Sequence, residues 1–231
     1  MAKPPLVLVV GMHRSGTSLL GGFLQYLGLS LPGETIAGDV HNPEGYFEWQ
    51  QVVDIQERLL IDLERWWPAA EGTLALPENW QQHPATREAR AALRNLLVAE
   101  VDRQHGPWGI KDPRCSRLLP LWIDLAAELD LPLNLLLAVR DPAEVVSSLL
   151  SRDGPLTGLD VNRGQQLWWR HNLEVVHVAK ASMLPIAVVD FGCWFTLPEV
   201  QLQRLLQAIP ALQPSQSKQQ EALALIRPEH R

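Results

Sequence analysis

The strongest constraint on the fold of this chain lies near its N-terminus. An uninterrupted apolar run from Leu6 to Val10 leads directly into GMHRSGTS at residues 11 to 18. The valine-rich run predicts a buried parallel strand, and the glycines after it predict a tight turn into a helix. This order directs several backbone N–H groups and the positive end of a helix dipole at one point. It therefore predicts a phosphate-binding loop rather than a strand–turn–helix unit without a ligand.

The loop differs from the P-loop of nucleotide triphosphatases at one position. Gly11, Gly16 and Ser18 match the pattern G-x-x-x-x-G-K-[ST]. Thr17 replaces the lysine that reaches the β- and γ-phosphates, and Arg14 supplies a cation earlier in the loop. We therefore predict that the loop binds a single 5′-phosphate without a metal ion, and that Arg14 reaches the transferred group. The predicted contact residues are His13, Arg14, Ser15, Gly16, Thr17 and Ser18.

Apolar periodicity predicts the other elements of the chain. Strands are expected at 6–10, 108–111, 131–139 and 185–189, and helices at 17–27, 50–63, 86–101, 117–129, 143–150, 165–181 and 198–208. Strands that alternate with helices predict an α/β, P-loop-type three-layer fold with a mostly parallel central sheet flanked by helices. The 231 residues suit a single domain. The Gln-rich tail from residue 210 is expected to be a short helix or a loose segment.

Composition argues against several classes of protein. A net charge of −6 disfavours broad electrostatic binding to nucleic acid or to an anionic membrane. Cys115 and Cys193 form neither a disulfide framework nor a metal-binding spacing, so we expect a reducing, cytoplasmic compartment. The run at 6–10 is far shorter than the roughly 20 residues that cross a bilayer, and we expect neither a signal peptide nor membrane insertion.

A second anion-binding pattern, AVRDPAEVVSSLLSR, spans residues 138 to 152. Arg140 follows a predicted buried strand, at the carboxyl end where open α/β sheets bind ligands. Asp141 and Pro142 predict a helix start, as the N-cap and the first-turn residue. Ser148 lies two turns along that helix, so its hydroxyl and the Arg140 guanidinium can converge on one anion. The alternative is a capped helix whose arginine forms a salt bridge.

Together, GMHRSGTS and the later VRDP-x5-S resemble the two phosphate-binding motifs of sulfotransferases that use 3′-phosphoadenylyl sulfate (PAPS). A third stretch, WGIKDPRCSRLLPLW at 108–122, is similar to a K-D-P segment of tyrosylprotein and several bacterial sulfotransferases. Those branches resemble this chain also in the loop arginine, where cytosolic sulfotransferases carry lysine. The motifs cover residues 6 to about 152, and beyond them, to about residue 209, only the order of elements is compatible.

The resemblance implies that the first loop holds the 5′-phosphosulfate and that Arg140 and Ser148 hold the 3′-phosphate. It implies in-line transfer of a sulfuryl group to a hydroxyl or amine, with 3′-phosphoadenosine 5′-phosphate (PAP) as the product and no metal. Arg14 is the first candidate for stabilising the charge of the transition state, and Lys111 is the second. A proton for the leaving group, if one is needed, would come from Lys111, because arginine stays charged.

The acceptor also needs a base, and candidates lie in HNPEGYFEW at residues 41–49. Similarity to the N-P-x-G-Y-[FW]-E segment of bacterial sulfotransferases indicates Glu48, whereas similarity to the E-x-x-F-F of heparan-type enzymes indicates Glu44. We rank Glu48 first, Glu44 second, and Glu34 and His41 below them. A helix-capping role for Glu48 stays open, because acids are favourable in a first helical turn.

The acceptor can be a small molecule, a carbohydrate, a lipid headgroup or a peptide, and the sequence does not choose among them. The acceptor pocket is expected within residues 29–84 and 152–165. The oligomeric state is open as well. Arg114 is expected to contact the substrate or a phosphate, or to be a surface charge. Arg152 is expected to help hold the 3′-phosphate or to form a salt bridge with Asp153. One alternative function is a P-loop small-molecule kinase that uses Mg-ATP, which would need the missing loop lysine and a metal-binding acid. The other is a non-catalytic nucleotide-binding protein on the same fold.

Overall fold

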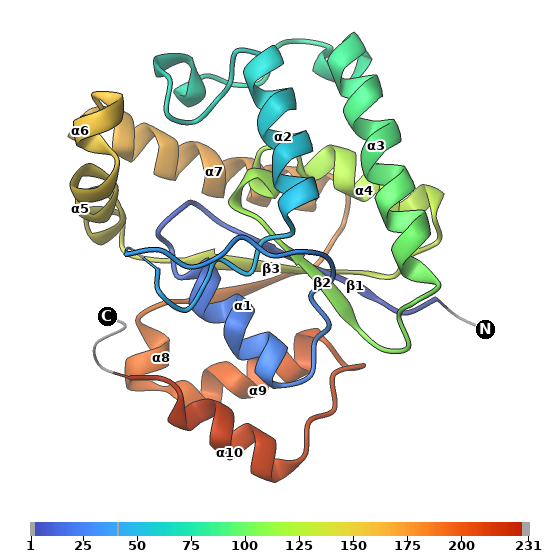
Figure 1. The fold of residues 1–231 in the computed structure, drawn as a ribbon. Helices are drawn as coiled ribbons and strands as arrows, with labels where there is room; N and C mark the ends of the chain where they lie inside the picture. Colours follow the sequence, from blue (N-terminus) through green and yellow to red (C-terminus); the bar gives the residue numbers. More distant parts are fainter. Residues whose placement is uncertain (1–2, 41, 228–231) are drawn as a thin grey trace.

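The computed structural model describes residues 3–40 and 42–227 of the chain. Its centre is a parallel sheet with the strand order β2-β1-β3-β4 (Figure 1). The strands are β1 (Leu6–Val10), β2 (Trp108–Lys111), β3 (Leu133–Val139) and β4 (Ile186–Asp190). The predicted α/β fold with a parallel central sheet is therefore confirmed.

Helices cover both faces of the sheet. Their bounds are α1 (Thr17–Tyr26), α2 (Gln50–Asp62), α3 (Pro84–Val101), α4 (Leu119–Glu128), α5 (Pro142–Arg152), α6 (Gly154–Thr157), α7 (Val161–Ala181), α8 (Cys193–Thr196), α9 (Pro198–Ala208) and α10 (Gln216–Ala224). In Figure 1, α2, α3, α4 and α7 lie above the sheet, and α1, α8, α9 and α10 lie below it. Alternate residues of β1 face the two layers, because side chains of a strand point to opposite sides. Leu6 and Leu8 are buried in the upper core, and Val7 and Val9 in the lower core.

Every predicted strand and helix is present, and the ends are displaced by a few residues. The helix expected from residue 165 begins earlier, at Val161, where the Asp160 side chain accepts a backbone N–H of the first turn. The Gln-rich tail contains α10, and Ala222 of that helix is buried in the lower core. Of the two possibilities for the tail, the short packed helix is therefore the one observed.

All strands of a parallel sheet have their carboxyl ends on the same side, which we call the carboxyl edge, and the segments that follow the strands meet there. The phosphate loop follows β1, Lys111 closes β2, Arg140 follows β3, and Phe191 follows β4. Residues of four distant segments are therefore brought to one edge of the sheet. Within the described part of the chain, no helix is long and apolar enough to cross a membrane.

Candidate active site

A cavity of about 580 Å³ opens at the carboxyl edge of the sheet. Its wall contains the phosphate loop after β1, Lys111 from β2, Arg140 after β3 and Phe191 after β4. Segment 42–48 and Ser148 of α5 complete much of the remaining wall. The cavity thus joins the three motifs at residues 11–18, 108–122 and 138–152.

The phosphate loop has a backbone that only glycine tolerates at two positions. Gly11 has a φ of 140° and Gly16 a φ of 83°. A Cβ on Gly11 would lie 2.4 Å from the carbonyl oxygen of Ala138, and one on Gly16 would lie 2.3 Å from Cδ2 of Phe191. Gly16 is also the N-cap of α1 and has no side chain to occupy the helix end. The first backbone N–H groups of α1 therefore suit an anion.

Ser116, which carries no motif signal of its own, anchors the start of this loop. Its Oγ accepts a hydrogen bond from the backbone N–H of Gly11 at 2.9 Å and donates one to the Gly11 carbonyl oxygen at 3.2 Å. Ser116 ends a short 3₁₀ helix, Pro113–Ser116, so the helix expected from residue 117 starts only at Leu119. Asp112 caps this turn and Pro113 begins it, a pair that signals a helix start in the sequence, but the contact of Ser116 with Gly11 depends on the sheet order.

Most of the predicted loop residues line the cavity. His13, Arg14, Gly16, Thr17 and Ser18 line it, whereas Ser15 does not. The Ser15 side chain is buried, and its hydroxyl has no hydrogen-bond partner among the described residues.

His13 packs against the rings of Trp67 and His171, with ring centroids 4.7 and 6.3 Å apart. Burial lowers the pKa of His13 well below its ordinary value, and the charge of Arg114 lowers it further. His13 is therefore neutral at neutral pH, so it can contact a ligand without adding a positive charge.

The two predicted anion-binding motifs meet through one hydrogen bond. Arg14 Nε donates to Ser148 Oγ at 2.8 Å, so the first loop and helix α5 are in direct contact. Burial lowers the pKa of Arg14, and the neighbouring charge of Arg152 lowers it further. Arg152 also lines the cavity, and its Nε forms an ion pair with Asp153 at 2.8 Å. Two guanidinium groups therefore lie close together on this wall.

Arg140 lines the same cavity and also forms the helix salt bridge that was the alternative interpretation. Its Nε lies 2.7 Å from Glu144 Oε2, one turn into α5, and its guanidinium lies 4.3 Å from the ring centroid of Phe191. A second hollow of about 590 Å³ shares Arg14, Arg140, Ser148 and Arg152 with the first. This side of the site is therefore rich in cations and hydroxyl groups.

Glu48 and Lys111 form a buried ion pair at the cavity wall. Lys111 Nζ lies 2.6 Å from Glu48 Oε1, and the two side chains are 1% and 6% exposed. Lys111 Nζ also donates to the carbonyl oxygen of Tyr46 at 2.8 Å and to Ser18 Oγ at 3.1 Å. An ammonium group has three N–H donors, and these contacts use all of them. The capping alternative for Glu48 is not realised, because α2 has Trp49 as its N-cap and no side-chain cap.

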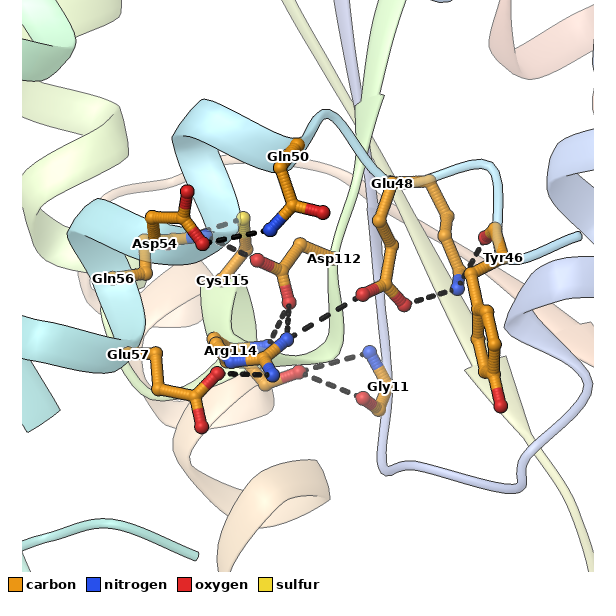
Figure 2. A network of polar contacts seen from close by, with 12 residues as sticks. Gly11, Tyr46, Glu48, Gln50, Asp54, Gln56, Glu57, Asp112, Arg114 and Cys115 are labelled. Atoms are coloured by element: carbon orange, nitrogen blue, oxygen red, sulfur yellow. Dashed lines mark hydrogen bonds and ion pairs between the residues drawn. The ribbon is translucent and has the colours of Figure 1, made fainter. Parts of the chain in front are cut away.

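Arg114 connects Glu48 to two further carboxylates, as Figure 2 shows. Its guanidinium nitrogens lie 3.5 Å from Glu48 Oε2, 3.0 Å from Asp112 Oδ1 and 3.0 Å from Glu57 Oε2. Burial alone would lower the pKa of Arg114, but Asp112, Glu48 and Glu57 together raise it above its ordinary value. Burial raises the pKa of Asp112, and the charge of Arg114 opposes this rise. Arg114 is therefore permanently charged and belongs to a salt-bridge network rather than to the cavity lining.

The other candidate bases lie in different surroundings. Glu44 is exposed and lines the cavity, whereas Glu34 is exposed and is not part of the lining. His41 lies outside the described residues. In the part of the chain that the structure describes, no group of three or more His, Cys, Asp and Glu side chains is arranged to hold a metal ion.

Comparisons with known proteins agree with this architecture. No protein-family model and no curated protein matches the chain. Among solved structures, the sulfotransferase domain of the Synechococcus olefin synthase aligns with a TM-score of 0.56 and 19% identity, over 100% of this chain and 83% of that one. The chain has a sulfotransferase-like fold.

Two further structures with this sulfotransferase-like fold are similar to the chain. The sulfotransferase domain from the curacin biosynthetic pathway aligns with a TM-score of 0.56 and 15% identity, over 96% of this chain and 78% of that one. A sulfotransferase from Mycobacterium tuberculosis aligns with a TM-score of 0.58 and 14% identity, over 97% of this chain and 72% of that one. At these identities the similarity establishes the fold, and the activity of this chain has to be argued from its own residues.

Proposed function

We propose that the protein is a sulfotransferase that moves a sulfuryl group from PAPS to a hydroxyl or amine acceptor, without a metal ion. One observation carries this proposal: the phosphate loop and the Arg140/Ser148 motif line one cavity, and Arg14 Nε contacts Ser148 Oγ. PAPS has a phosphosulfate at its 5′ position and a separate phosphate at its 3′ position. The cavity wall has two separate, positively charged sites that can each bind an anion. Such a pair suits a donor with two separate phosphate groups better than a linear triphosphate.

The reaction breaks the bond between sulfur and the oxygen that bridges it to the 5′-phosphate. A bond forms between sulfur and the acceptor oxygen or nitrogen, and PAP leaves with the bridging oxygen. Arg14 is proposed to offset the negative charge that develops on that oxygen, because it is cationic and lines the cavity. Lys111 also lines the cavity and donates a hydrogen bond to Ser18 Oγ at 3.1 Å, the longest of its three. We propose that Lys111 helps to stabilise the charge on the same oxygen through the Ser18 hydroxyl.

The acceptor loses a proton in this reaction, and we propose that Glu48 takes it. Glu48 lines the cavity, and Lys111 and Arg114 hold its carboxylate in a defined position. Glu44 is the alternative base, because it lines the cavity from an exposed position. The acceptor itself is proposed to be a small molecule, a carbohydrate or a peptide that enters beside segment 42–48.

Calorimetric titration tests the donor site without knowledge of the acceptor. Wild-type protein is titrated with PAP, with ADP, and with ATP plus Mg²⁺. We expect selective PAP binding of micromolar affinity, about −8 kcal/mol, in the absence of metal. The Arg140→Ala/Ser148→Ala variant should bind PAP about 100-fold or more weakly, because each charge-assisted hydrogen bond contributes about 1.5–3 kcal/mol.

Arg90→Ala is the matched control, since it also removes one arginine. It breaks an exposed ion pair between Arg90 of α3 and Glu128 of α4, and neither residue lines the cavity. It should bind PAP like the wild type. A preference for Mg-ATP would support the kinase alternative and overturn the proposal. PAP binding without any consumption of PAPS, across a broad panel of acceptors, would instead support a non-catalytic binding protein.

A further inference from the structure

We propose that Arg114 is a positioning residue for sulfuryl transfer, which holds the Glu48 carboxylate in the position where it takes the acceptor's proton. The inference rests on the sulfotransferase function proposed above. Arg114 does not line the cavity, whereas Glu48 does, so Arg114 acts on the reaction only through Glu48. Three observations carry the proposal: the direction of the hydrogen bonds, the geometry of the guanidinium, and the charge of the cluster.

The buried side chain of Trp122 sets the donor and acceptor roles in the hydrogen bonds that lead to Asp112. Trp122 Nε1 can only donate, and it donates to Gln56 Oε1 at 2.8 Å. This fixes the orientation of the Gln56 amide, so its Nε2 donates to Asp112 Oδ2 at 2.6 Å. Asp112 Oδ1 accepts two more bonds, from the backbone N–H of Arg114 at 2.9 Å and from its guanidinium at 3.0 Å. Three donors on two oxygens stabilise the charged carboxylate of Asp112 and so oppose the rise in its pKa that complete burial causes.

The guanidinium of Arg114 is in turn held on two sides. Asp112 binds one terminal nitrogen, and Glu57 binds the other at 3.0 Å. The nitrogen that contacts Asp112 also lies 3.5 Å from Glu48 Oε2. A planar guanidinium fork can bridge several carboxylates in this way, and a lysine ammonium on a flexible stem cannot match its geometry. Figure 2 shows Arg114 between Asp112, Glu57 and Glu48, which supports a role in orienting Glu48.

The charge of the cluster explains why Glu48 is suited to accept a proton. Lys111 and Arg114 supply two positive charges, against the three negative charges of Glu48, Asp112 and Glu57. With all five groups charged, the cluster carries one net negative charge, and one added proton makes it neutral. Neutralisation is favourable in a buried site, where unpaired charge is costly.

Loss of Arg114 would change this balance. One cation would then face three carboxylates, and the cluster would take up a proton from solvent before any acceptor is bound. A base that already holds a proton cannot accept another, so transfer would require higher pH. Glu57→Gln changes the balance in the opposite direction, because two cations then face two carboxylates. The two substitutions should therefore shift the acid limb of the pH–rate profile in opposite directions.

The experiment measures PAP release from PAPS between about pH 5 and pH 9, with water as one acceptor and ethanol, which stays protonated over this range, as a second. The variants are Arg114→Met, Arg114→Lys and Glu57→Gln. Arg114→Met should lower kcat about 100-fold at neutral pH and recover part of the rate at high pH, with PAP affinity within about threefold of wild type. Arg114→Lys should fall between Arg114→Met and wild type, and the acid limb of Glu57→Gln should move to lower pH.

Arg117→Met is the structural control, because Arg117 is also a buried arginine and pairs with Glu174 outside the cavity lining. It should lower stability without shifting the acid limb. If the wild type turns over PAPS but the acid limb of Arg114→Met or of Glu57→Gln does not shift, the proposed role of Arg114 is wrong. The proposed sulfotransferase function would still stand in that case. If Arg114→Met does not fold, the Glu57→Gln shift decides the matter, since Glu57 is only partly buried. A wild type that neither binds PAP nor consumes PAPS would overturn the proposed function itself.

Discussion

The buried pair between Lys111 and Glu48 leads to a prediction about stability that requires no ligand. Lys111→Met removes the cation and leaves the Glu48 carboxylate, which is 6% exposed, with Arg114 at 3.5 Å as its remaining charged partner. The Ser18 hydroxyl and the Tyr46 carbonyl oxygen lose a donor at the same time. Removing one partner of a buried ion pair is costly, because the other charge stays in a poorly solvated site.

The expected loss of unfolding free energy is about 3–5 kcal/mol. For a protein of this size, roughly 2–4 °C of melting temperature is lost for each kcal/mol, so Tm should fall by about 6–20 °C. Glu48→Gln should also be destabilising, because it leaves Lys111 without its carboxylate. The double variant should cost about 2 kcal/mol less than the sum of the two single variants, since both remove the same interaction.

Urea unfolding followed by circular dichroism gives these free energies, and the four proteins form a double-mutant cycle. Arg58→Met is the control, because the pair between Arg58 and Asp62 has side chains that are 77% and 31% exposed. Its loss should change stability by no more than about 0.5 kcal/mol. If Lys111→Met stays within about 1 kcal/mol of the wild type, Lys111 and Glu48 do not form a poorly solvated ion pair in solution.

Two further predictions concern the loop anchor and a buried histidine. Ser116→Ala leaves the buried N–H of Gly11 without a partner, so it should cost about 1–3 kcal/mol in urea unfolding and weaken PAP binding; unchanged values for both would contradict the anchoring role. Burial lowers the pKa of His171 to about 3, so the unfolded chain binds a proton near pH 6.5 that the folded protein excludes. His171 alone should therefore lower stability as pH drops below 6.5, by roughly 2–3 kcal/mol at about pH 4.5, and His13 acts in the same direction. His171→Gln should show a flatter pH dependence, and equal slopes for both proteins would count against this assignment.

Local patterns in the sequence determined the elements that carry the phosphate-binding motifs. The apolar run at Leu6–Val10 predicts a buried strand because every residue on both of its faces is apolar. Gly11 and Gly16 predict the turn because their backbone angles are unfavourable for other residues, and the observed φ values agree. Asp141 predicts the start of α5, where its side chain accepts backbone N–H groups of the first turn. These features depend only on neighbouring residues, so a single sequence contains them.

The tertiary structure alone decided which side chains share an environment. Glu44 and Glu48 stand in the same short motif, yet packing leaves Glu44 exposed and buries Glu48 against Lys111. Arg114 and Ser116 carry no pattern that names Glu48 or Gly11 as their partners. Those contacts exist because β2 lies beside β1 in the sheet, which brings residues distant in sequence to one edge. Sheet order and burial set the charge balance of the site, and neither follows from the spacing of residues along the chain.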